Sequence, residues 1–122
     1  MSQPTAVLFY VAEPAKSTAF YEDILGLKPA MKSTCFTLFK LDNDFELALW
    51  AVNKAEPAAT VHRESSELGL LVPNKAALES TRQQWIKRGI PIVSEPQKMD
   101  FGGDHFVGLD PDGHRLRVAT PY

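Results

Sequence analysis

Apolar and polar residues alternate along several short stretches of the chain, and this alternation predicts β-strands because successive strand side chains point to opposite faces. In the first half, the pattern predicts strands over 5–11, 33–41 and 45–52. Residues 14–27 instead place apolar side chains at helical spacing, such as Phe20 and Ile24, before the helix-ending Gly26. The first half is therefore predicted to form a strand, a helix and a β-hairpin.

The second half repeats this order of elements. Asn74 is suited to cap a helix that continues to about Arg88, and Gly89 is suited to end it. Strands are predicted over 67–73 and 90–93, and a closing hairpin over 103–121. Two segments without a clear period, 53–66 and 94–103, are predicted to be loops. The repeated order indicates two modules of about 60 residues each.

The closing hairpin contains a turn with a specific geometry. The motif DPDGH at 110–114 matches a type I turn followed by a glycine in the left-handed conformation, which pairs the first and fifth residues of the motif. This register places Val107 opposite Arg117 and His105 opposite Ala119. His105 and Arg117 are therefore predicted to share one face of the sheet.

The hairpin around LDND, at 41–44, leaves two registers open. An even number of loop residues would put Phe39 on the same face as Trp50, whereas an odd number would put Phe36 there. We select the even register, and therefore Phe39, as the prediction.

Composition and charge exclude several classes of protein. The length of 122 residues suggests one domain, and a formal net charge of -2 without a basic run indicates no nucleic-acid partner. Cys35 is the only cysteine, so an internal disulfide and a CxxC metal site are excluded. The N-terminal apolar run is too short to span a membrane and follows no basic region. We therefore expect a cytoplasmic protein without a membrane partner.

Several motifs carry a family resemblance. FYEDILGL at 20–27 and DPDGHRLRV at 110–118, placed in two similar halves, resemble the glyoxalase/bleomycin resistance/dioxygenase superfamily, also called vicinal oxygen chelate proteins. More narrowly, LALWAVNKAEPA, SSELGLLVP, QQW and MDFGG are similar to phenazine antibiotic resistance proteins. Those proteins bind their drug and have no known need for a metal.

The resemblance covers nearly the whole chain and implies an α+β fold. It implies one domain over 1–122, built from two βαβββ modules at about 1–58 and 62–122. The modules are expected to form a curled mixed sheet around a cavity, and the protein is expected to be a homodimer.

The superfamily's enzymes hold a metal ion with four strand residues, and the resemblance places those positions here at Ala6, Ala48, Glu67 and Arg117. Only Glu67 can ligate a metal, because a methyl group has no donor atom and a guanidinium is a fixed cation without an acceptor. We therefore expect no metal site and no cofactor.

The same strand faces supply a candidate ligand site instead. Trp50 and Phe39 would stack on a planar ring, and Glu67, His105 and Arg117 would contact its polar edges. Met99 and Phe101 would form a soft apolar rim. Arg115 is expected to extend toward the rim or solvent. The predicted ligand-binding residues are Trp50, Phe39, Glu67, Met99, His105 and Arg117.

Each of these residues also has a structural interpretation. Trp50 would serve equally as a core or dimer-interface aromatic, and His105 as a strand histidine with its hydrogen bonds satisfied. Glu67 and Arg117 would form an ion pair with or without a ligand.

Two functional hypotheses from different classes follow, and the first is preferred. It is a binding protein that sequesters a planar aromatic antibiotic such as a phenazine. The second is a lyase, isomerase or dioxygenase that uses a metal, or that uses Glu67 as a general base. A purely regulatory or interacting domain has no supporting feature beyond the expected dimer.

Overall fold

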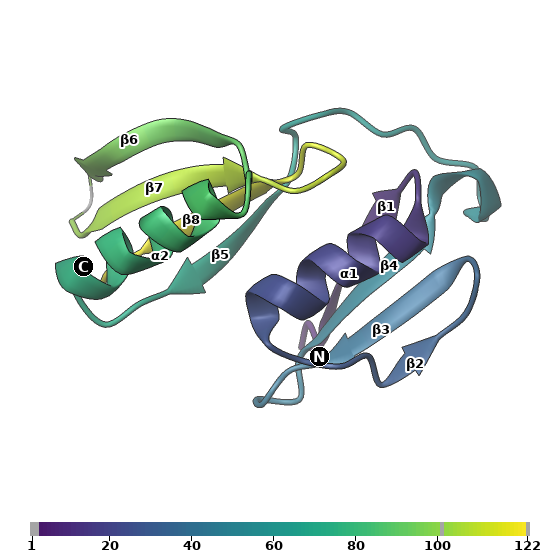
Figure 1. The fold of residues 1–122 in the computed structure, drawn as a ribbon. Helices are drawn as coiled ribbons and strands as arrows, with labels where there is room; N and C mark the ends of the chain where they lie inside the picture. The colour runs from purple at the N-terminus through teal and green to yellow at the C-terminus, as the bar shows by residue number, and fades with distance from the viewer. Residues whose placement is uncertain (1–2, 101, 122) are drawn as a thin grey trace. The chain divides into compact units, whose positions relative to one another are not determined.

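The structure is a computed structural model that describes residues 3–100 and 102–121, so Phe101 of the predicted apolar rim lies outside the described residues. The chain divides into two compact units, Met1–Val61 and His62–Tyr122. Each unit contains one helix and one four-stranded mixed sheet, in the order strand, helix and three strands (Figure 1). The predicted α+β fold of two βαβββ modules is confirmed.

The first unit pairs its strands in the order β1-β4-β3-β2. Its elements are β1 (Ala6–Val11), α1 (Pro14–Leu25), β2 (Met31–Lys32), β3 (Phe36–Lys40) and β4 (Glu46–Ala51), and a 3-10 turn follows at Val52–Lys54. Strand β1 runs parallel to β4, and the other pairs are antiparallel. Helix α1 covers one face of this sheet (Figure 1). The ring centroids of Phe9 in β1 and Tyr21 in α1 lie 6.4 Å apart, and both residues are buried.

The second unit has the equivalent sheet order, β5-β8-β7-β6, with β5 parallel to β8. Its elements are β5 (Glu67–Leu71), α2 (Lys75–Lys87), β6 (Ile92–Lys98), β7 (Asp104–Leu109) and β8 (Arg115–Ala119). Trp85 packs α2 against one face of this sheet. Its ring contacts that of Phe106 edge-on, with the two ring centroids 5.4 Å apart. The opposite face of the sheet is not covered by α2 and carries the charged residues of β5 and β8.

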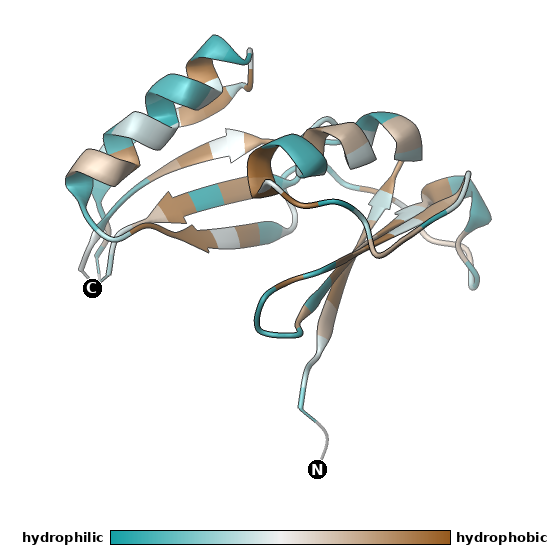
Figure 2. Ribbon diagram, turned by 60° about the horizontal axis from the view of Figure 1, so that its bottom comes forward, coloured by the Kyte–Doolittle hydropathy of each residue, from teal (hydrophilic) through white to brown (hydrophobic). Residues whose placement is uncertain are grey.

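The local signals at both helices act as predicted. Gly26 ends α1 in the left-handed conformation, with φ of 65°, which a residue without Cβ adopts at little cost. The side chain of Asn74 accepts a hydrogen bond from the backbone N–H of Ala77 and thereby caps α2. Apolar residues predominate in β1 and β4, whereas polar residues predominate in α2 (Figure 2).

The register predicted for the first hairpin is wrong. Phe36, rather than Phe39, lies opposite Trp50, and Phe39 is fully buried on the face that packs against α1. The loop has three residues, 42–44, and closes with a hydrogen bond from the N–H of Leu41 to the carbonyl of Phe45. Asp44 occupies its left-handed position, with φ of 65°. Aspartate tolerates this conformation, but unlike glycine it does not strongly predict it. The sequence therefore did not indicate a three-residue loop and left the register undecided.

The register predicted for the closing hairpin is confirmed. The N–H of Asp110 donates to the carbonyl of His114, and Gly113 between them has φ of 85°. As expected, Val107 lies opposite Arg117, and His105 lies opposite Ala119.

Strand β6 extends to Lys98, although residues 94–103 were predicted to be a loop. Its pairing with β7 is irregular, with register shifts between Ile92 and Ser94 and again between Ser94 and Gln97. Extra residues at such bulges interrupt the alternation of side chains between the two faces of a strand. The sequence pattern therefore did not predict this strand. No helix in the described ranges 3–100 and 102–121 is long and apolar enough to cross a membrane.

Candidate functional site

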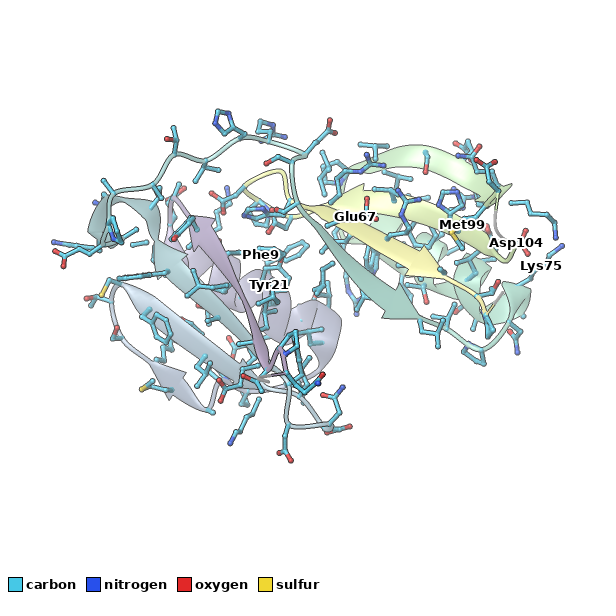
Figure 3. All side chains as sticks on the ribbon, turned by 180° about the vertical axis from the view of Figure 1, so that it is seen from behind. Phe9, Tyr21, Glu67, Lys75, Met99 and Asp104 are labelled. Carbon is cyan, nitrogen blue, oxygen red and sulfur yellow. The ribbon has the colours of Figure 1, made fainter. Side chains whose placement is uncertain are left out.

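Strands β5, β7 and β8 bring a polar cluster together on the face of the second sheet that α2 leaves open. Glu67 begins β5 and lies beside Arg115 of β8, while Arg117 lies two residues further along the same face. His105 of β7 lies on the neighbouring strand. Figure 3 views this sheet from behind the view of Figure 1, with Glu67 and Met99 labelled on it.

One carboxylate contacts two guanidinium groups within this cluster and accepts hydrogen bonds from one of them, Arg117. The Nε of Arg117 donates to Oε1 of Glu67 at 2.6 Å, and its Nη2 donates to Oε2 at 3.0 Å. This two-point contact is the geometry in which an arginine and a carboxylate bind most strongly. The Nε of Arg115 is also 3.4 Å from Oε2 of Glu67. Arg115 thus contacts the cluster while its side chain stays one-third exposed, and its expected direction toward the rim or solvent stays a prediction.

Arg115 joins the cluster with an unsatisfied donor. Its Nε is buried and has no hydrogen-bond partner among the described residues, whereas its side chain as a whole is one-third exposed. A buried donor without an acceptor is unfavourable unless a water molecule or ligand supplies one. The cluster therefore has more positive charge and more donor capacity than Glu67 alone can satisfy.

His105 completes the cluster through its Nδ1 atom, which contacts Nη1 of Arg117. Because a guanidinium only donates, Nδ1 is the acceptor, and a neutral imidazole must then carry its proton on Nε2. Burial of the ring, together with the positive charge of Arg117, lowers the pKa of His105 below its ordinary value of 6.5. His105 is therefore neutral at physiological pH and offers one N–H donor.

The same contacts fix the charges of Glu67 and Arg117. Hydrogen bonding from Arg117 lowers the pKa of Glu67 below 4.5, although partial burial opposes this effect. The bond to Glu67 raises the pKa of Arg117 in turn. Both side chains are therefore charged across the whole physiological pH range, and Glu67 is a weak proton acceptor.

A cavity of about 520 Å³ adjoins this cluster in the second unit. It is lined by Glu67, Gln97, Lys98, Met99, Asp100, His105 and Arg117. Four of the six predicted ligand-binding residues therefore line one cavity, and they come from β5, β7, β8 and the segment that follows β6.

The remaining aromatic candidate, Trp50, lies in the first unit on the face of the sheet opposite α1. Tyr10 of β1 and Phe36 of β3 flank it, each with a ring centroid 6.4 Å from that of Trp50. The strand register explains why the three rings lie together, because it places Tyr10 and Phe36 on the strands at either side of Trp50. Trp50 is partly exposed, so this aromatic surface has area available for a ligand.

Several of these residues were missed at the level of sequence. Phe36 was missed through the choice of loop length. Lys98 and Gln97 were missed because the bulges of β6 conceal its strand pattern. Tyr10 lies beside Trp50 through the register of the parallel pairing between β1 and β4, which was not predicted from the sequence.

The four positions implied for metal ligands do not fit a metal ion. Ala6 and Ala48 offer methyl groups, and Arg117 offers a cation already bound to the one available carboxylate. Among residues 3–100 and 102–121, no group of three or more His, Cys, Asp or Glu side chains lies close enough to hold one. The donor set therefore does not match the oxygen and imidazole ligands that divalent metals require.

Comparison with known proteins decides the family. The model of the Glyoxalase/Bleomycin resistance protein/Dioxygenase superfamily matches residues 4–118. The chain belongs to this superfamily. Within it, the chain is 31% identical to the phenazine antibiotic resistance protein EhpR of Enterobacter agglomerans over 119 residues, which cover 95% of this chain and 90% of that protein.

Two solved structures, whose chains are covered almost completely, have the same fold. An Agrobacterium tumefaciens protein determined by solution NMR is 38% identical, with a TM-score of 0.92 over 100% of this chain and 99% of that one. A glyoxalase-related enzyme from Fulvimarina pelagi is 20% identical, with a TM-score of 0.85 over 99% and 89% of the two chains. The second likeness shows the superfamily fold alone.

Proposed function

We propose that this superfamily member binds and sequesters a planar aromatic antibiotic, such as a phenazine, without a metal ion and without chemical turnover. Its relative EhpR is a phenazine antibiotic resistance protein, and the alignment covers nearly the full length of both chains. The homodimer and the cytoplasmic location expected from the sequence remain predictions within this proposal.

The observation that carries the proposal is the aromatic surface of the first unit. Trp50 offers a partly exposed indole that lies between two further rings, those of Tyr10 and Phe36. Stacked aromatic pairs contribute about 0.5–1.5 kcal/mol beyond the area that they bury. A surface of this kind favours flat, aromatic ligands.

Binding without turnover is supported by the state of the polar cluster. A general base should have a pKa near the working pH, but the pKa of Glu67 is lowered and both of its oxygens accept from Arg117. His105 uses its acceptor nitrogen to contact Arg117. Neither side chain has a free, suitably basic atom, so the acid–base enzyme is the less well supported alternative.

An equilibrium-dialysis titration with phenazine, in an excess of chelator, tests the proposal. We expect saturable binding and recovery of unchanged phenazine from the complex. The Trp50→Ala substitution should weaken binding by about tenfold, which corresponds to about 1.4 kcal/mol of lost stacking and contact.

Phe39→Leu is the matched control, because Phe39 lies on the same pair of strands but on the buried face. It should lower stability by about 1 kcal/mol and leave the dissociation constant unchanged. Absence of phenazine binding, or recovery of a modified compound, would refute the proposal.

A further inference from the structure

The two rings that flank Trp50 in the first unit contact it in different ways. The ring centroids of Tyr10 and Phe36 are both 6.4 Å from that of Trp50. The plane of Phe36 lies at 79° to that of the indole, in an edge contact, whereas the plane of Tyr10 is tilted by 37°. Edge-to-face packing is one of the two arrangements that aromatic pairs prefer. Phe36 therefore makes the more specific ring contact with Trp50.

The pairing of β3 with β4 brings Phe36 and Trp50 directly opposite each other. The N–H of Ala51 donates to the carbonyl of Cys35 at 2.8 Å, so Cys35 and Ala51 are joined by a hydrogen bond, and Phe36 and Trp50 are the next pair along. Hydrogen-bonded and non-hydrogen-bonded pairs alternate in an antiparallel ladder, and facing side chains come closest in the second kind. Tyr10 instead lies on β1, at the end of the sheet.

A tight turn holds the backbone of Phe36 at the start of β3. The N–H of Ser33 donates to the carbonyl of Phe36 at 2.7 Å, and the N–H of Phe36 donates to Oγ of Ser33 at 3.1 Å. The same Oγ accepts from the N–H of Cys35 at 3.3 Å. Hydrogen bonds at both its N–H and its carbonyl therefore fix the position from which the Phe36 ring projects.

Trp50 benefits from such a neighbour because its own ring is not enclosed. Leu49 and Ala51, which precede and follow it along β4, are buried, whereas Trp50 is only half-buried. A side chain that is free to change rotamer must be ordered when a ligand binds, and this ordering lowers the affinity. A neighbour that holds the ring beforehand removes this cost.

From these contacts we infer that Phe36 is a positioning residue for ligand binding, since it holds the indole of Trp50 in the orientation in which a flat aromatic ligand stacks on it. Phe36 acts through Trp50 and not through a contact of its own with the ligand. This inference rests on the proposed function and adds to it the residue that orients the stacking ring.

A double-mutant cycle on Phe36 and Trp50 tests this role, by equilibrium dialysis with phenazine in an excess of chelator. Phe36→Leu should weaken binding about threefold, because the indole must then be ordered when the ligand binds. In the Trp50→Ala background the same substitution should cause no further loss, because the ring that Phe36 positions is absent. Phe36→Tyr keeps the ring and should bind phenazine as tightly as the unsubstituted protein.

A second measurement follows the indole without any ligand. Phe36→Leu should increase the fast component in the time-resolved fluorescence anisotropy of tryptophan, which reports local motion of the ring. Trp85 is 4% exposed and packs against Phe106, so its contribution should stay constant. Phe39→Leu is the matched control, because it makes the same chemical change on the same strand but on the buried face. It should leave the anisotropy and the affinity unchanged.

The outcomes distinguish this inference from the proposed function. Unchanged affinity in Phe36→Leu, with phenazine still bound by the unsubstituted protein, would overturn the inference and leave the proposed function intact. An equal loss with and without the indole would also overturn it, because Phe36 would then act independently of Trp50. Absence of phenazine binding by the unsubstituted protein would overturn both. If Phe36→Leu does not fold, Phe36→Met replaces it with the same expected results.

Discussion

At the scale of single residues, the contact between Glu67 and Arg117 determines the electrostatics of the second unit. The Arg117 contact lowers the pKa of Glu67 below its ordinary 4.5, so the folded state favours the ionised carboxylate. A carboxyl group with a lowered pKa stabilises the fold above its unfolded-state pKa, and this contribution is lost as pH falls through the folded-state pKa. Glu67 therefore contributes stability at neutral pH that disappears in acid.

The substitution Glu67→Gln tests this contribution. Because the Glu67 side chain is 37% exposed, solvent screening limits the expected loss of unfolding free energy at neutral pH to about 1 kcal/mol. The stability curves of the variant and the unsubstituted protein should converge as pH falls well below 4.5, since protonated glutamate resembles glutamine. Urea unfolding across this pH range measures the difference.

Glu79→Gln is the matched control, because Glu79 also accepts two hydrogen bonds from one arginine, Arg82, but on an exposed helix surface. Its effect should be smaller than that of Glu67→Gln. A constant difference between the Glu67 variant and the unsubstituted protein at every pH would show that ionisation of Glu67 does not contribute to stability.

At the scale of elements, two glycines on different strands of the same sheet have opposite roles. Gly108 of β7 lies beneath Trp85 of α2, and a Cβ atom there would be 2.8 and 2.9 Å from atoms of the indole ring. It would also be 3.2 Å from the carbonyl oxygen of Pro91. Gly69 of β5 instead faces open space. The close packing of α2 on its sheet thus depends on the missing side chain at Gly108.

The substitution Gly108→Ala should lower the unfolding free energy by about 1–3 kcal/mol, because the added methyl group must displace a ring packed against the strand. Gly69→Ala makes the same chemical change on a strand of the same sheet and should alter stability by less than about 0.5 kcal/mol. Denaturant unfolding of both variants gives the comparison. Equal losses in the two would contradict the packing described for Trp85.

At the scale of the whole molecule, the effect of metal ions on stability can be measured without knowing the ligand. A metal ion that binds only the folded state raises its stability, by about 2.7 kcal/mol when its concentration is 100 times its dissociation constant. We expect chelator, and separately added zinc, nickel or manganese, to leave the melting temperature unchanged, since the implied ligand positions hold two alanines and an arginine. An increase with any one metal, reversed by chelator, would contradict this expectation.

Family membership and the order of elements were accessible from sequence because they depend on local signals. The two helices have recognisable ends at Gly26 and Asn74, and most strands keep a period of two. Gly113 likewise fixed the register of the closing hairpin, which in turn placed His105 and Arg117 on one face. Each of these signals involves residues close together in the chain, whose conformational preferences do not require the rest of the fold.

Only the tertiary structure decided the features that depend on contacts between distant segments. Asp44 adopts the left-handed conformation that glycine adopts in the other hairpin. The resulting three-residue loop sets a register in which Phe36, rather than Phe39, lies beside Trp50. The contact of Arg115 with Glu67 was decided in the same way, because the sheet brings it beside a carboxylate 48 positions earlier in the chain. A charged side chain on a strand takes its direction from the partners that the sheet brings near it, and sequence periodicity does not identify those partners.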